Sequence, residues 1–362
     1  MRAPAMKEGE ILSAASSHLV TGGAGFIGCN LVDRLLANGQ HVVLFDDFSR
    51  PGSRANLDWL RERHGDAVVV REGDVRDAEL VSAALEGTRV VYHLAGQTAV
   101  TTSIGDPIAD FDVNVRGTIN VLEAARARTS PPIVVYASTN KVYGDLEDQR
   151  IAEEPTRYVL TDLPYGIAES AVLDFTSPYA CSKGAADQYV LTYAKTYGLP
   201  AVVLRQSCIY GPRQMGVEDQ GWAAWLVFAG AAGIPATIYG DGKQVRDLLY
   251  VDDLVDAYLA VAASISTTGG RAYNIGGGPE FAVSIWQEFS QLLRDLGQVP
   301  PEVSFGPARQ GDQRVYVSDT RRAMSDFGWA PATPPREGLE RLCEFVVSAV
   351  PALHDLLVDR SG

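Results

Sequence analysis

A glycine-rich turn between an apolar run and a helical pattern constrains the fold of this chain more than any other feature. The segment HLVTGGAGFIG places Gly22, Gly25 and Gly28 directly after the run at 17–21 and at the start of a helix with one apolar stripe. In this context the first glycine allows a tight turn, the second lets backbone approach a pyrophosphate, and the third lets helix and strand pack closely. The N-terminus of the helix then faces negative charge. The turn therefore predicts a strand–helix unit that binds a dinucleotide.

Strand-like runs alternate with helical segments through the first 210 residues. The runs are SHLVT (17–21), HVVLFD (41–46), AVVVR (67–71), RVVYHLAG (89–96), PIVVYAS (132–138) and AVVLRQSCIY (201–210). This alternation predicts an α/β fold, a Rossmann doubly wound parallel sheet with helices on both faces. After Gly211 the pattern loosens, which predicts a second domain. The expected parts of the chain are a leader (1–16), a dinucleotide-binding Rossmann domain (17–211) on which 246–265 packs back, and a smaller C-terminal substrate-binding α/β domain (212–362).

Composition excludes several classes of protein. The chain has 362 residues with 46% hydrophobic and 21% charged, which is typical of a globular protein of about two domains. Its net charge of −14 repels phosphate polymers, so we expect no nucleic-acid partner. The 4 cysteines are scattered, without a Cys/His cluster, and predict reduced thiols and no metal site. Without an apolar stretch of membrane-spanning length or a signal peptide, we expect a cytoplasmic protein with no membrane partner.

Asp46 closes the second apolar run and bears on the choice of dinucleotide. Its carboxylate can accept hydrogen bonds from both ribose hydroxyls of an adenosine and would repel a 2′-phosphate, which favours NAD over NADP. Arg50, in the loop that follows, could instead tolerate such a phosphate. Asp74 could contact the adenine amine or form an Asx turn. His93 lies inside an apolar run and is interpreted as a core residue rather than a catalytic one.

Tyr179 and Lys183 lie four residues apart in a predicted helix, so they share one face. A neighbouring ammonium favours the phenolate form of a tyrosine. Such a phenol can take a proton from a substrate hydroxyl while hydride leaves the carbon. On its own this pair also fits an exposed aromatic residue beside a solvated lysine. Together with the glycine turn, the pair predicts hydride transfer.

These segments together resemble the extended short-chain dehydrogenase/reductase family of NAD-dependent nucleotide-sugar epimerases and dehydratases. The resemblance covers nearly all of residues 17–345, through TGGAGFIG, HLAGQTAV, YASTNKVYG, SPYACSK, CIYGPRQ, YGDGKQVRDLLYVDD and YNIGGG. Within the family, the chain is most similar to the CDP-paratose (CDP-tyvelose) 2-epimerases. That similarity rests on DDFSRPGSRANLDWL, GQTAVTTSIGDP, LPYGIAESAVLDFTSPYACSKGAADQYVL and SCIYGPRQMGVEDQGW.

The resemblance implies a role for each matching residue. Thr139 and Tyr179 fall on the family's catalytic Ser/Thr and acid/base tyrosine, and Lys183 on the lysine that binds nicotinamide ribose and lowers the tyrosine pKa. The implied site for tightly bound NAD comprises Gly22, Gly25, Phe26, Ile27, Gly28, Asp46, Asp47, Ser49, Arg50, Asp74, Val75, Leu94, Ala95, Gly96, Thr98, Asn114, Ser138, Tyr179, Lys183 and Ser207. The implied site for a nucleotide-diphosphate sugar comprises Gln97, Ser103, Thr139, Asn140, Lys141, Cys208, Arg213, Tyr239, Arg246 and Arg309, of which the last two would bind the diphosphate.

Two departures from the family pattern bear on the reaction. Asn140 and Lys141 stand where 4,6-dehydratases carry an Asp-Glu pair, so elimination of water would lack its acid and base. These two residues could touch the sugar, or Lys141 could point to solvent. Cys208 stands where many members carry asparagine, and the 2-epimerases also carry cysteine there. Its thiol could simply be packed in the core. Arg246 could instead form a surface ion pair with Asp247.

The expected function is therefore NAD-dependent epimerisation of a nucleotide-diphosphate sugar, by oxidation to a ketone and return of hydride to its opposite face. The resemblance places the reaction at C2 of a CDP-hexose, and a UDP-sugar 4-epimerase is the alternative. A 4,6-dehydratase and a non-catalytic dinucleotide sensor are the other rivals. The resemblance also implies a homodimer through helices near 112–128 and 179–197. The adjacent Asp252 and Asp253 are interpreted as an N-cap, not as a catalytic pair.

Overall fold

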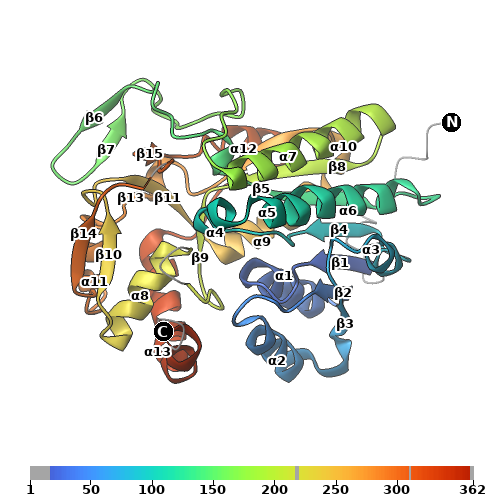
Figure 1. The fold of residues 1–362 in the computed structure, drawn as a ribbon, viewed down its shortest axis with the longest axis horizontal. Coiled ribbons are helices and arrows are strands. Elements are labelled where there is room, and N and C mark those ends of the chain that lie inside the picture. Colours follow the sequence, from blue (N-terminus) through green and yellow to red (C-terminus); the bar gives the residue numbers. More distant parts are fainter. Residues whose placement is uncertain (1–16, 217–219, 310, 359–362) are drawn as a thin grey trace.

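A seven-stranded parallel sheet forms the larger half of the molecule (Figure 1). The structure is a computed structural model that describes residues 17–216, 220–309 and 311–358, so the expected leader (1–16) lies outside the described residues. The strand order is β12-β8-β5-β4-β1-β2-β3, and every neighbouring pair is parallel. The strands are β1 (Ser17–Thr21), β2 (His41–Asp46), β3 (Val69–Glu72), β4 (Val90–His93), β5 (Ile133–Thr139), β8 (Ala201–Gln206) and β12 (Ala272–Ile275). The doubly wound Rossmann prediction is confirmed.

Helices cover both faces of this sheet because alternate strand residues point to opposite sides. On one face, α1 (Phe26–Ala37), α2 (Ser53–His64) and α9 (Val251–Ala263) pack on side chains such as Val20 and Val135. On the other face, α3 (Ala78–Ala84), α6 (Gly117–Arg126) and α7 (Pro178–Tyr197) pack on side chains such as Leu19 and Val134. Strands buried on both sides read as continuous apolar runs, which is the pattern of this sequence.

The later part of the chain returns to this sheet from Val251 onward, and not from 246 as expected, because 246–250 lie in β11 (Val245–Tyr250), which pairs with strands outside this sheet. Helix α9 contributes Leu254, Tyr258 and Val261 to the core beneath β1 and β4. Strand β12 then pairs with β8 as the edge strand, and α12 (Arg321–Phe327) packs against β12. The short helix α10 (Ile265–Thr268) joins α9 to β12.

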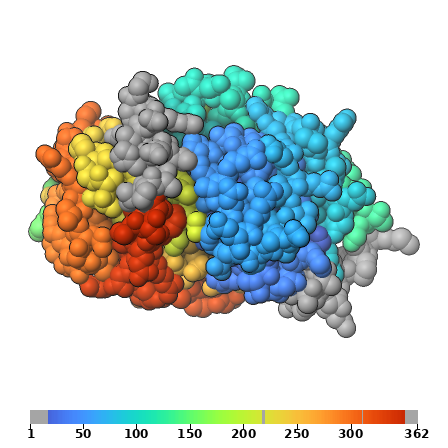
Figure 2. Space-filling model, turned by 90° about the horizontal axis from the view of Figure 1, so that it is seen from below, coloured from blue at the N-terminus to red at the C-terminus, as the bar shows by residue number. Residues whose placement is uncertain are grey.

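The smaller half of the molecule lies beside the carboxyl ends of the strands (Figure 1), and Figure 2 shows the early and late parts of the chain side by side. It contains small sheets and helices packed around one apolar cluster. Its strands are β9 (Cys208–Tyr210), β10 (Ala236–Tyr239), β11 (Val245–Tyr250), β13 (Ala282–Ser284), β14 (Val303–Gly306) and β15 (Val315–Tyr316). Its helices are α8 (Trp222–Ala232), η5 (Pro279–Phe281), α11 (Phe289–Asp295) and α13 (Pro335–Val358).

The remaining short elements connect the two halves or flank the strands. They are η2 (Gly65–Ala67), α4 (Val100–Gly105), α5 (Pro107–Phe111), η3 (Asp112–Arg116), η4 (Asn140–Val142), β6 (Ile151–Glu153) and β7 (Tyr158–Leu160). Strands β6 and β7 form an antiparallel hairpin. Among the described residues, no helix combines the length and the apolar character that crossing a membrane would need.

The run at 201–210, expected as one strand, divides at Ser207 into β8 and β9. The amide of Ser207 donates to the carbonyl of Ile275, and its hydroxyl donates to the carboxylate of Asp247. These contacts end the pairing with β12 and start a new pairing with β11, in which Cys208 lies opposite Leu248. The chain therefore changes sheets at this residue and carries Cys208 into the smaller half.

The N-cap interpretation of Asp252 and Asp253 is wrong. Helix α9 begins at Val251, with Tyr250 as its N-cap residue. The carboxylate of Asp253 instead accepts hydrogen bonds from the amides of residues 332 and 333, at 3.0 and 2.8 Å. Acidic side chains in the first turn also favour the positive end of the helix dipole. This carboxylate is therefore used in holding the segment before α13.

Candidate functional site

The glycine turn lies at the point where the strand order reverses between β1 and β4. A Cβ placed on Gly22, whose φ is 68°, would lie 2.8 Å from the amide nitrogen of Ala95, and one on Gly28 would clash with the carbonyl oxygen of Gly22. Helix α1 begins after Gly25, and no side chain caps its first amides. The first backbone amides of α1 can therefore bind the pyrophosphate of a dinucleotide at the point where the strand order reverses.

A cavity of about 370 Å³ opens from this turn along the carboxyl ends of the strands. It collects most of the residues that the sequence assigned to the cofactor, together with two that it assigned to the substrate. The residues of the two sets that line it are Gly22, Gly25, Phe26, Ile27, Gly28, Asp46, Asp47, Ser49, Arg50, Asp74, Val75, Leu94, Ala95, Gly96, Gln97, Thr98, Ser138, Tyr179, Lys183 and Arg213. We call this the first cavity. Its glycine turn and acidic rim fit NAD.

Two carboxylates border the far end of the first cavity. Asp46 accepts hydrogen bonds from the amides of Ala24 and Phe48, at 3.0 and 2.8 Å, and burial raises its pKa. Asp74 forms the Asx turn that the sequence allowed, accepting from the amide of Arg76 at 2.8 Å. The Arg76 guanidinium holds the pKa of Asp74 below its usual value. Both carboxylates therefore also shape the loops that enclose the cavity.

Arg50 crosses the first cavity from the loop after β2. Its guanidinium donates to the hydroxyl of Thr98 at 2.6 Å and to the side-chain oxygen of Gln220. Gln220 was not predicted, and it lines both the first cavity and the second one described below. Arg213, expected at the substrate, lines the first cavity and lies over the rings of Trp59 and Phe345, at 4.2 and 5.2 Å.

The predicted catalytic residues meet beside the first cavity. Ser177 caps α7 by accepting from the amide of Ala180, which places Tyr179 in the first turn of the helix. Lys183 follows one turn later, and its ammonium donates to the carbonyl of Ala137 at 2.5 Å. Thr139, at the end of β5, lies near enough to the phenol of Tyr179 to favour its ionised form, and its hydroxyl donates to Asn140 at 3.3 Å. Tyr179 and Lys183 therefore face the first cavity and are buried. The alternative of an exposed aromatic residue beside a solvated lysine is wrong.

The electrostatics of this pair differ from the expectation. Burial raises the pKa of Tyr179 to about 12, while the Thr139 hydrogen bond and the positive charge of Arg50 oppose the shift. Burial lowers the pKa of Lys183 to about 7, although the negative charges of the nearby Asp110 and Asp187 raise it. We expected Lys183 to lower the tyrosine pKa, but Thr139 and Arg50 are the groups that do so in this structure. The Lys183 ammonium instead donates a hydrogen bond to the backbone carbonyl of Ala137 on β5.

Five predicted residues line neither cavity because their polar groups already bind other parts of the protein. They are Ser103, Asn114, Thr139, Asn140 and Ser207. The Ser103 hydroxyl accepts from the amide of Tyr179 at 3.1 Å, and the Asn114 amide group bonds the backbone of Gln97. Asn140 donates to Gln313 at 3.2 Å. Their expected contacts with a ligand stay predictions, and in this structure their polar groups contact neighbouring parts of the site.

His93 is confirmed as a core residue. It is 1% exposed, and its two ring nitrogens contact the hydroxyls of Thr21 and Thr118 at 2.7 and 3.0 Å. Burial lowers its pKa to about 3, so the ring is neutral. Within the parts of the chain that the structure describes, no group of His, Cys, Asp and Glu side chains could hold a metal ion.

A second cavity of about 470 Å³ adjoins the first and lies in the smaller half. The predicted substrate residues that line it are Lys141, Cys208, Tyr239, Arg246 and Arg309. Much of its wall is apolar, from Trp222, Trp225, Leu226, Ile238 and Ile285. Both tryptophans line this cavity. Convergent cations in an apolar hollow suit a ligand with both a phosphate and a flat or apolar part.

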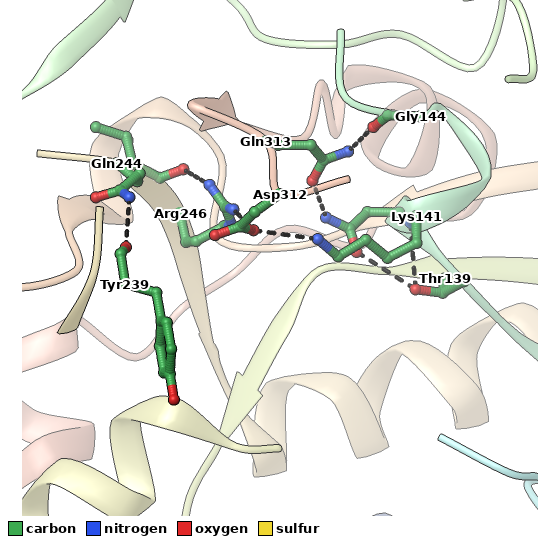
Figure 3. A network of polar contacts seen from close by, with 10 residues as sticks. Thr139, Lys141, Gly144, Tyr239, Gln244, Arg246, Asp312 and Gln313 are labelled. Atoms are coloured by element: carbon green, nitrogen blue, oxygen red, sulfur yellow. Dashed lines mark hydrogen bonds and ion pairs between the residues drawn. The ribbon is translucent and has the colours of Figure 1, made fainter. Parts of the chain in front are cut away.

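Two cations of the second cavity, Lys141 and Arg246, contact one carboxylate, Asp312 (Figure 3). Its Oδ1 lies 2.7 Å from Arg246 and 3.4 Å from the ammonium of Lys141. The expected alternative, a surface pair between Arg246 and Asp247, is wrong, since the Arg246 side chain is 6% exposed and bonds Asp312. Arg309 lies over the ring of Tyr239 at 3.7 Å. Asp312 was not predicted, because it lies far from Lys141 and Arg246 in the sequence.

Comparison with known proteins agrees with this arrangement. Residues 18–276 match the family described as the NAD dependent epimerase/dehydratase family. A CDP-paratose 2-epimerase from Salmonella typhi is 41% identical over 339 residues, which cover 91% of this chain and 99% of that protein. A UDP-glucose 4-epimerase from Mycolicibacterium smegmatis is 36% identical over 328 residues, covering 90% of this chain and 97% of that protein.

Solved structures give the same result. A UDP-glucuronic acid 4-epimerase from Bacillus cereus, in complex with UDP-glucuronic acid and NAD, matches with a TM-score of 0.79 and 27% identity. The match covers 92% of this chain and 99% of that chain.

Proposed function

The chain belongs to the NAD-dependent epimerase/dehydratase family, and we propose that it inverts C2 of a CDP-linked hexose. The observation that carries the proposal is the pairing of Tyr179 with Thr139 beside a glycine turn, next to a second cavity lined by cations. The choice of CDP and of C2 follows the relative that is 41% identical and named for that reaction. A 4-epimerase of a UDP-sugar, the activity that names the second relative, is the alternative.

The residues of this chain have separate tasks in that reaction. NAD, when bound, would supply the reversible uptake of hydride from the sugar carbon. Tyr179 takes the proton of the sugar hydroxyl and later returns it, while the Thr139 hydroxyl holds the reacting oxygen. Lys183, fixed to the Ala137 carbonyl, orients the nicotinamide ribose. No net oxidation occurs, so tight retention of the cofactor serves the cycle.

The residues after Thr139 support an epimerase over a dehydratase. Elimination of water needs an acid and a base close to the sugar. Asn140 and Lys141 stand at those positions; the first is bonded to Gln313 and the second is paired with Asp312. Neither side chain is a carboxylic acid. A dehydratase product would therefore contradict the proposal.

A panel of nucleotide sugars tests the assignment. We expect the NAD-loaded protein to epimerise a CDP-hexose at C2, with the CDP-sugar strongly preferred over its UDP and dTDP counterparts. Identification of each product by NMR locates the inverted carbon. Inversion at C4 of a UDP-sugar would replace the proposal with its alternative, and a 4-keto-6-deoxy product would remove epimerisation altogether.

We also propose that the protein is a homodimer, with the interface moved from the expected helices near 112–128 and 179–197 to α5 and α7. These helices pack together and expose apolar side chains on the protein surface. Ile108 and Phe111 on α5 are 70% and 49% exposed, and Tyr189 and Tyr197 on α7 are 44% and 55% exposed. Such a patch commonly marks an interface. Sedimentation should give about twice 38.9 kDa, and Phe111→Glu should lower the mass toward one chain. A wild-type mass near one chain would contradict the dimer.

A further inference from the structure

Lys141 joins the catalytic threonine to the cations of the second cavity. It lies two residues after Thr139, in η4, and its backbone amide donates to the Thr139 hydroxyl at 3.3 Å. From there its side chain extends toward Asp312 (Figure 3). The η4 turn is itself held in place, because Gln313 accepts from Asn140 and donates to the carbonyl of Gly144 at 2.6 Å. The backbone of Lys141 is therefore held by Thr139, and its side chain is held by Asp312.

The ammonium of Lys141 and the guanidinium of Arg246 converge on the same oxygen of Asp312. The distances are 3.4 and 2.7 Å, and the two cationic side chains are 23% and 6% exposed. Burial opposes ionisation of Asp312, but Arg246 and Lys141 together hold its pKa below the ordinary value. Burial also lowers the pKa of Lys141, with Asp312 opposing the shift. A further anion at this point would stabilise both cations.

The charges that face the second cavity suit a diphosphate. Among the described residues that line it, the charged side chains are three cations, Lys141, Arg246 and Arg309, and one carboxylate, Asp312. Their sum is an excess of two positive charges, equal and opposite to the charge of a diphosphate diester. Arginine and lysine differ in this role, since a guanidinium grips two oxygens while an ammonium acts as a compact point charge. Lys141 is the cation of the three that is joined to Thr139.

We propose that Lys141 determines the reacting carbon by binding, together with Arg246, the phosphate attached to the sugar. This inference rests on the proposed function. The lysine holds that phosphate at the end of the second cavity closest to Thr139 and Tyr179. In a nucleotide sugar, C2 is bonded to the anomeric carbon that carries the diphosphate, whereas C4 lies across the ring. A phosphate held next to the catalytic hydroxyls therefore presents C2 to the phenol and keeps C4 away from it.

Two substitutions of Lys141 test this role. Lys141→Met keeps the length and apolar stem of the side chain and removes its charge, while Lys141→Arg keeps the charge. The matched control is Lys195→Met, which removes an exposed lysine on α7. NAD content and thermal melting are measured first, and should be unchanged in all variants. Lys141→Gln replaces the methionine variant if the latter does not fold.

The first measurement is calorimetric binding of CDP to the NAD-loaded proteins. Loss of one charged hydrogen bond predicts a dissociation constant about 10- to 100-fold higher for Lys141→Met. Lys141→Arg should recover most of the affinity, and Lys195→Met should match the wild type. Unchanged CDP affinity in folded Lys141→Met would overturn the inference, whatever the reaction catalysed.

The second measurement is turnover of a CDP-hexose at saturating concentration. If Lys141 sets the position of the sugar, kcat for inversion at C2 should fall about 10-fold or more in Lys141→Met, beyond the change in KM. Weaker binding with an unchanged kcat would overturn the assignment of the reacting carbon to Lys141. A wild-type protein that inverts no CDP-hexose would instead overturn the proposed function, while the CDP titration would still decide the phosphate contact.

Discussion

Replacing Tyr179 with phenylalanine should lower turnover by about 10²- to 10⁴-fold and leave the amount of bound NAD unchanged. The substitution removes the phenol that lies beside Thr139 in the first cavity and that is proposed to exchange a proton with the sugar hydroxyl. The ring of the side chain stays, so the packing at 8% exposure is kept. Steady-state kinetics and the absorbance of released cofactor measure the two quantities separately.

Tyr189→Phe is the matched control, because this tyrosine lies on the same helix with 44% of its surface exposed. Its turnover should equal that of the wild type. A Tyr179→Phe protein that retains turnover within about tenfold of the wild type would contradict the acid/base role, since a positioned proton donor contributes more than that. Loss of NAD along with turnover would show that the tyrosine serves binding instead.

Replacing Asp187 with alanine should lower the free energy of unfolding by about 3–5 kcal/mol. Asp187 on α7 is 0% exposed and receives the guanidinium of Arg205 on β8 through two bonds, at 2.8 and 3.1 Å. Ser138 also donates to this carboxylate at 2.9 Å. Removing the carboxylate leaves Arg205 buried, at 4% exposure, without its counter-charge. Urea unfolding of the NAD-free proteins measures the change.

The control for this substitution is Asp162→Ala, which breaks an exposed ion pair with Arg150. The two side chains are 58% and 81% exposed and lie 3.5 Å apart. Such pairs contribute about 0–1 kcal/mol, so little change is expected. A loss below about 1 kcal/mol for Asp187→Ala would mean that Arg205 finds another partner or reaches water. The buried pair would then not be a main stabilising contact between α7 and the sheet.

The cofactor side of the site could be predicted from sequence because its signals are local. The turn at Gly22, Gly25 and Gly28 needs residues without a Cβ, so its glycines stand out in the sequence. Asp46 ends the neighbouring strand. The parallel sheet followed equally well from apolar runs, since each strand is buried on both faces. Spacing alone also placed Tyr179 and Lys183 on one helix face, where the structure has them.

The substrate side depends on contacts between distant parts of the chain, which no local pattern reveals. Asp312 pairs with Lys141, 171 positions away, and with Arg246, 66 positions away. The prediction that Lys183 lowers the pKa of Tyr179 was wrong. Sequence spacing shows that two residues are close but not how deeply they are buried, and burial has the largest influence on the pKa of both groups. The end of β8 at Ser207 likewise depends on Asp247, a residue of another sheet.

Hydride return within one active site is tested most directly by an isotope experiment. NAD-loaded protein is incubated with a CDP-hexose in deuterated water, and the product is followed by NMR at C2. We predict inversion at C2 with the original hydrogen retained on that carbon, because the hydride never exchanges with solvent. Deuterium at the inverted carbon would instead show removal and return of a proton, and would contradict the transient ketone formed by Tyr179 and bound NAD.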